Sequence, residues 1–100
     1  MATTNNLVQI LLPTNGVDEG VFERLAQKLT AKFGGVTSFI RAPAEGRWNA
    51  GSHKEHDDIA VVEVMAEDID YEYWADLRSR LEQALAQEQI VIRCQPLELL

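Results

Sequence analysis

Apolar residues follow two different periods along this chain. Four short apolar runs, each bounded by turn or polar residues, lie at residues 7–12, 36–41, 59–65 and 90–94. Runs of that length, rich in valine, isoleucine and leucine, are typical of strands. Within residues 21–33 and 74–85, apolar residues instead recur every three or four positions, the spacing of one face of a helix. The predicted order is strand, helix, strand, strand, helix, strand.

Both predicted helices have recognisable ends. The first stops at Gly34-Gly35, because glycine tolerates the left-handed conformation that a helix end favours. The second is preceded by Asp68 and Asp70, either of which is a suitable N-cap. The helices therefore connect strands through short, well-defined links.

Two strand–helix–strand halves in succession predict an α+β protein with a ferredoxin-like βαββαβ fold, also called an α-β plait. Its four-stranded antiparallel sheet would carry both helices on one face. Right-handed crossovers place the first and third strands in the middle of this sheet. A chain of 100 residues is long enough for one core and not for two, so residues 1–100 are predicted to form a single domain.

Side chains alternate across a strand, so each predicted strand presents two sets of residues. One set is wholly apolar and should lie under the helices: Val8, Ile10, Leu12, Ala60, Val62, Val64, Ile90, Ile92 and Cys94. The other is also largely apolar, although a sheet face in water should be mostly polar: Leu7, Leu11, Ile59, Val61, Met65 and Val91. Such surface marks an interface or a ligand groove. We therefore predict a homodimer or higher homo-oligomer that pairs through this open face.

Polar residues stand within this second set, one on each of three strands: Gln9, Glu63 and Arg93, with Thr37 and Arg41 on the remaining strand. One interpretation is a cross-strand ion pair between Glu63 and Arg93 that has no function. The other is a small-molecule site, in which a few polar groups orient a ligand among apolar walls. Glu63 and Arg93 are then the candidate catalytic residues, with Glu63 as a general base. Whether the protein is an enzyme stays open.

The longest irregular stretch, residues 42–58, supplies the remaining candidates. Trp48 either packs this loop down or covers the open face as a lid, where it would bind a ligand. His53 and His56 are three residues apart with carboxylates beside them, a combination that suits zinc or nickel. A solvated, charged loop explains the same run, so no metal or other cofactor is assigned.

The charge balance narrows the range of partners. The chain has 16 acidic against 9 basic residues and a net charge of −7. Nucleic acids and anionic membranes are bound through clustered lysine and arginine, so neither is expected. Residues 1–6 lack the features of a signal peptide and no apolar run is long enough for a membrane span, which predicts a cytoplasmic protein. The single Cys94 is expected to be a buried, inert thiol.

The segment Phe33-Gly34-Gly35-Val36-Thr37, followed by Ala44-Glu45-Gly46-Arg47-Trp48 and a valine-rich third strand, resembles small uncharacterised bacterial families of this topology. At the level of topology, the whole chain is also similar to the dimeric α+β barrel superfamily. Those proteins pair the open sheet faces of two subunits and often enclose a small-molecule site, so the resemblance implies a homodimer. The histidine and asparagine arrangements of the haem-degrading and quinone-forming barrel monooxygenases are not recognisable in this sequence.

Overall fold

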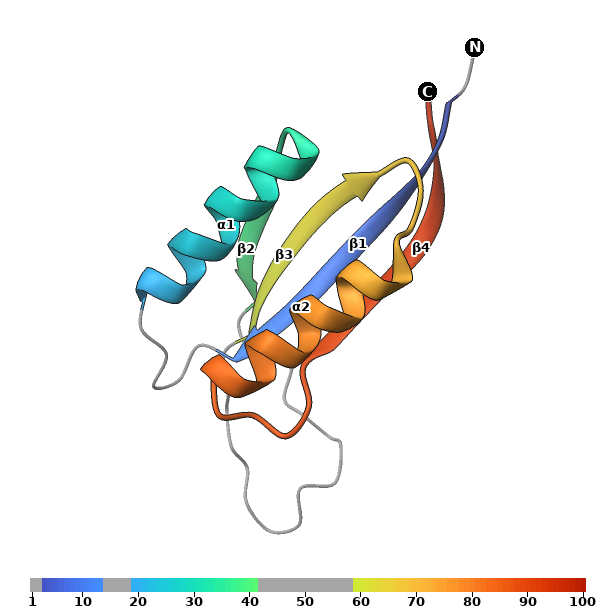
Figure 1. The fold of residues 1–100 in the computed structure, drawn as a ribbon. Coiled ribbons are helices and arrows are strands. Elements are labelled where there is room, and N and C mark those ends of the chain that lie inside the picture. The colour runs from blue at the N-terminus through green and yellow to red at the C-terminus, as the bar shows by residue number, and fades with distance from the viewer. Residues whose placement is uncertain (1–2, 14–18, 42–58) are drawn as a thin grey trace, which may run out of the picture.

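The structure is a computed structural model, and it describes residues 3–13, 19–41 and 59–100 (Figure 1). Within these ranges, the elements follow in the order β1 (Thr3–Pro13), α1 (Glu19–Phe33), β2 (Thr37–Arg41), β3 (Ile59–Ala66), α2 (Tyr71–Ala84) and β4 (Val91–Leu99). The α+β class predicted from the sequence is confirmed. Neither helix in the described ranges has the length and apolar content needed to cross a membrane.

The strands form one antiparallel sheet in the order β2-β3-β1-β4. All four lie abreast only at the levels of Gln9, Ile10 and Leu11 of β1, because β2 begins opposite the first of these and β4 begins opposite the last. On either side the sheet is three strands wide. Residues Thr3–Asn5 pair with β4 alone, and this two-stranded ribbon extends beyond the helices, with both termini at its tip (Figure 1).

The predicted ferredoxin-like fold is therefore corrected. It implies a regular layer four strands wide, whereas four strands lie side by side at three levels of β1 only. The last strand, predicted over residues 90–94, is also longer than expected, since β4 continues through Pro96 to Leu99. Proline donates no N–H, but an edge strand leaves one side unpaired and tolerates it. The fold is α+β with a sheet of uneven width.

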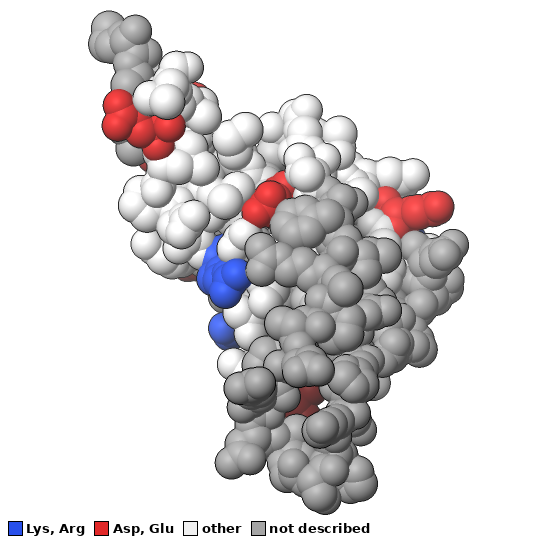
Figure 2. Space-filling view, turned by 180° about the vertical axis from the view of Figure 1, so that it is seen from behind, with Lys and Arg blue, Asp and Glu red and all other residues white. Residues whose placement is uncertain are grey.

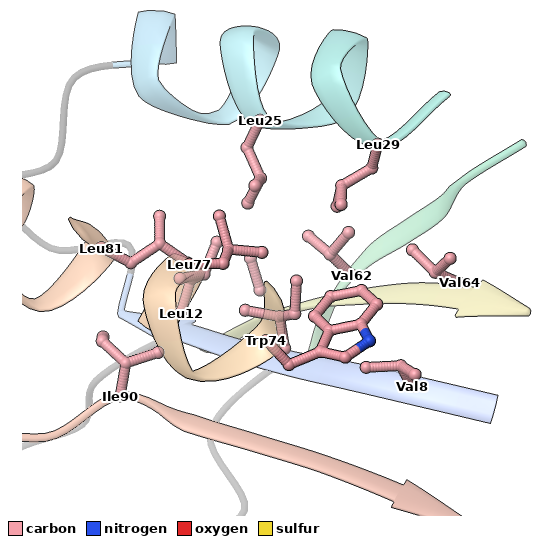
Figure 3. Close-up of a cluster of buried hydrophobic side chains, with 12 residues drawn as sticks. Val8, Leu12, Leu25, Leu29, Val62, Val64, Trp74, Leu77, Leu81 and Ile90 are labelled. Atoms are coloured by element: carbon pink, nitrogen blue, oxygen red, sulfur yellow. The ribbon is translucent and has the colours of Figure 1, made fainter. Parts of the chain in front are cut away.

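The hydrophobic core lies between the helices and one face of the sheet. The even-numbered residues from Val8 to Leu12 in β1 and from Ala60 to Val64 in β3 point toward side chains from both helices, as Figure 3 shows for four of them. The helices contribute Leu25, Leu29, Trp74, Leu77 and Leu81 to this cluster. The helix-facing set predicted for the two central strands is confirmed, since none of its members is more than 6% exposed.

The core ends at β4. Ile90, just before this strand, is 2% exposed, and Ile92 packs against the core as a half-buried side chain. Two residues further on, Cys94 is exposed, so the expectation of a buried thiol is wrong. The physical reason is that β4 is an edge strand, covered by helix only near its start.

One end of each helix is held by a specific hydrogen bond. Gly34 has a φ of 85°, a left-handed conformation that favours glycine, and its N–H donates to the Thr30 carbonyl over 2.8 Å. Asp70 caps α2 by accepting the Tyr73 N–H at 3.1 Å, as predicted. These two links fix the C-terminal end of α1 and the N-terminal end of α2.

Aromatic rings join those same two helix ends. Phe33 stacks on Trp74 with 5.3 Å between centroids, and Tyr73 meets both rings edge-on. The Lys32 ammonium lies 4.4 Å from the centroid of the Tyr73 ring. Burial raises the pKa of the Tyr73 phenol, an effect that the positive charge of Arg80 opposes. The phenol is therefore neutral at physiological pH, and its buried hydroxyl has no hydrogen-bond partner among the described residues.

Candidate functional site

The odd-numbered strand residues lie on the side of the sheet away from the helices, a surface that we call the distal face. Figure 2 shows the molecule from this side, where the described part is mostly uncharged, with small separate groups of basic and acidic atoms. Its described side chains include Leu7, Gln9, Leu11, Thr37, Ile59, Val61, Glu63, Met65, Val91, Arg93, Gln95 and Leu97.

The strand register brings four of the predicted site residues onto one level. Thr37 is paired with Glu63, Glu63 with Gln9, and Gln9 with Arg93. This polar row, Thr37–Glu63–Gln9–Arg93, crosses the whole sheet at a level where all four strands lie abreast. The register thus aligns these four residues, the condition on which treating them as one group depends.

The other candidates are not brought into the polar row. Arg41 lies at the end of β2, paired with Ile59, and is therefore four levels along the sheet from the Thr37–Glu63 pair. Trp48, His53 and His56 fall outside the described residues.

Gln9 is the residue that connects the charges of the polar row. Its Nε2 donates to Glu63 Oε2 over 2.6 Å, and its Oε1 accepts from Arg93 Nε at 2.8 Å. β1 lies between β3 and β4, so the charged residues are two strand spacings apart, roughly 10 Å. Within the described residues no direct Glu63–Arg93 ion pair is formed, because the two side chains bind the intervening Gln9 instead. The sequence analysis placed Gln9 in this group but missed its bridging role, which follows from having both a donor and an acceptor on a central strand.

Apolar side chains flank the polar row and differ in their exposure. Met65 is 52% exposed and Val91 is 43% exposed. Leu7 and Leu11 of β1 are half-buried. Val61 is the exception, at 2% exposed, which corrects the expectation that this whole set lacks a cover in the monomer. The distal face is thus apolar and open mainly near Met65 and along β4.

A hollow of about 600 Å³ opens beside one end of the polar row, where β3 runs on past the start of β2. Its lining combines the Glu63 carboxylate and the Thr37 hydroxyl with apolar and glycine residues: Leu7, Phe33, Gly34, Gly35, Val36 and Met65. We had assigned Gly34-Gly35 only the role of ending a helix. In the structure, the pair also lines this hollow, and the space next to each glycine, where a Cβ would lie, holds no other atom within 4 Å.

Metal binding has no support in the described part of the chain. No three of its histidine, cysteine, aspartate or glutamate residues lie close enough together to hold a metal ion. The candidate pair His53 and His56 is not among the described residues. The metal hypothesis therefore stays a prediction from sequence.

Comparison with known proteins adds no assignment. No protein-family model matches this chain, and no curated protein matches it. The resemblance to small bacterial families and to dimeric α+β barrels thus stays a prediction, and the function has to be argued from the distal face itself.

Proposed function

We propose that this protein is a self-associating module that forms a homodimer by pairing the distal faces of two copies. The observation that carries the proposal is where exposed apolar side chains lie. Five large hydrophobic residues in the described part are exposed, and three of them belong to the distal face: Met65, Val91 and Leu99. Apolar surface gathered on one sheet face is typical of an interface.

The polar row is compatible with burial in such an interface. A buried amide is costly only when its donor or acceptor lacks a partner. Gln9 has partners on both its amide nitrogen and its amide oxygen, supplied by Glu63 and Arg93. A second copy can therefore cover the centre of this face while the Gln9 amide nitrogen and amide oxygen each keep a hydrogen bond within the chain. The proposal includes no nucleic-acid partner, in keeping with the net charge of −7. It also includes a cytoplasmic location.

The proposal is tested by placing charge on the exposed apolar positions. We expect the wild type to sediment as a dimer of the 11.2 kDa chain in the micromolar range. The double variant Met65→Lys/Val91→Lys should weaken self-association by at least about 100-fold, because unpaired ammonium groups would have to be buried. Sedimentation velocity over a concentration series measures this.

The control is Tyr71→Lys, which adds one lysine, of the two in the double variant, at a 78% exposed residue on α2, away from the distal face. It should dimerise as the wild type does. A wild-type chain that stays monomeric throughout, or a double variant that dimerises as tightly as the wild type, would rule out pairing through this face.

A second candidate function, small-molecule binding or cofactor-free catalysis, is favoured by the hollow beside the polar row. Its Glu63 carboxylate can accept a hydrogen bond from an N–H donor, and the apolar lining suits an uncharged body. A thermal-shift screen of small amines and amides should then find stabilising ligands whose effect is lost in Glu63→Gln. Glu67→Gln, at an exposed residue just after β3, is the control that should keep it. An equal response from both variants would place the ligand elsewhere.

A further inference from the structure

We infer that the two copies of the proposed dimer are set in register by reciprocal pairing, with Glu63 of each copy opposite Arg93 of the other. The inference rests on the proposed function, because it concerns the same distal face. It starts from the groups of the polar row that the single chain leaves unused.

Glu63 and Arg93 each have polar side-chain atoms that their hydrogen bonds to Gln9 do not use. The hydrogen bonds among the described residues use one carboxylate oxygen of Glu63 and only the Nε of Arg93. The second carboxylate oxygen and the two terminal guanidinium nitrogens have no partner within the described part of the chain. A carboxylate and a guanidinium form their strongest contact when two such N–H groups face two oxygens, and Gln9 keeps that contact from forming within one chain.

Two ways of stacking one distal face on a second copy bring different residues together. If the two-fold axis runs across the strands, along the polar row, each residue faces its own copy. Glu63 then lies opposite Glu63, and Arg93 opposite Arg93. If the axis instead runs along β1, the neighbouring strands β3 and β4 are exchanged, because they lie on either side of β1 in the sheet. Glu63 then faces Arg93 twice, while Gln9 faces Gln9.

Electrostatics selects the second arrangement. Like charges placed opposite each other in an interface cost several kcal/mol, whereas opposite charges fix the register of two partners. Each chain also carries a net charge of −7, so two copies repel one another unless the contact itself brings opposite charges together. Stacked sheets lie roughly 10 Å apart, a gap that a glutamate and an arginine side chain span from opposite sides. The axis along β1 meets these requirements.

Charge reversal at the two positions tests the arrangement. Glu63→Arg places arginine opposite arginine, and Arg93→Glu places glutamate opposite glutamate. Each single variant should weaken homodimerisation by about 10- to 100-fold in sedimentation. An equimolar mixture of the two variants should associate, because every contact between the unlike chains then joins opposite charges. The double variant Glu63→Arg/Arg93→Glu should form a homodimer about as tight as the wild type.

The outcomes separate this inference from the proposed function. A monomeric wild type removes both. A dimeric wild type whose single variants dimerise equally well supports the proposed function and overturns the reciprocal pairing, as does a mixture that fails to associate. Far-ultraviolet circular dichroism of each variant establishes that it is folded. If one single variant is unfolded, the other single variant and the double variant still decide. Weaker homodimerisation in the single variant that is restored in the double variant supports the pairing, and any other result contradicts it.

Discussion

Replacing Val64 by lysine should abolish the cooperative thermal unfolding transition, whereas lysine at the adjacent Met65 should leave the fold intact. Val64 is 1% exposed and packs in the core under the helices, while Met65 is 52% exposed on the distal face. An ammonium group forced into the core without a partner costs several kcal/mol. A domain of this size has about 5–15 kcal/mol of stability in total, so that cost takes up most or all of it.

Circular dichroism at increasing temperature measures the effect. Met65→Lys is the matched control, because it introduces the same residue one position along the same strand. Its far-ultraviolet spectrum and folding transition should survive even if the dimer is lost. The alternation of faces along β3 would be wrong if Val64→Lys folded as well as Met65→Lys.

That alternation is the part of the structure which the sequence predicts best. A period of two places Val62 and Val64 on one face and Glu63 on the other, whatever the order of the strands. Both valines are buried in the core, and Glu63 lies on the distal face. The helix ends at Gly34 and Asp70 were predictable for the same local reason, because caps depend on a few adjacent residues.

Properties that depend on neighbouring strands were out of reach of local patterns. The ends of β2 and β4 depend on how far each strand pairs with its neighbour. The narrowing of the sheet and the passage of β4 through Pro96 were therefore not predicted, and neither was the exposure of Cys94. The direct Glu63–Arg93 ion pair was a wrong prediction for the same reason, because Gln9 of β1 lies between the two residues and binds both. The same strand order provides the Gln9 bridge. Tertiary context thus replaced a direct ion pair by two hydrogen bonds through Gln9. Glu63, Gln9 and Arg93 still lie on the predicted face.

Truncation of Trp74 to alanine should lower the free energy of unfolding by about 3–5 kcal/mol, the usual cost of removing a buried aromatic side chain. Trp74 is 7% exposed and belongs to the core formed by both helices and the central strands. It also stacks on Phe33 at the end of α1, so its loss frees one helix from the other as well as opening a cavity. Urea denaturation followed by circular dichroism gives the difference.

Tyr71→Ala is the control for this truncation, since it removes an aromatic ring from the same turn of α2 at a residue that is 78% exposed. Its effect should stay within about 0.5 kcal/mol. A similar loss in both variants would mean that the loss does not come from removing a buried ring, because alanine itself favours the helix more than either aromatic residue does. A large loss in Trp74→Ala alone would place the contact between α1 and α2 at the centre of the fold's stability. The exposed positions of the distal face would then be free to vary for association, because the cluster that packs against both helices lies on the other side of the sheet.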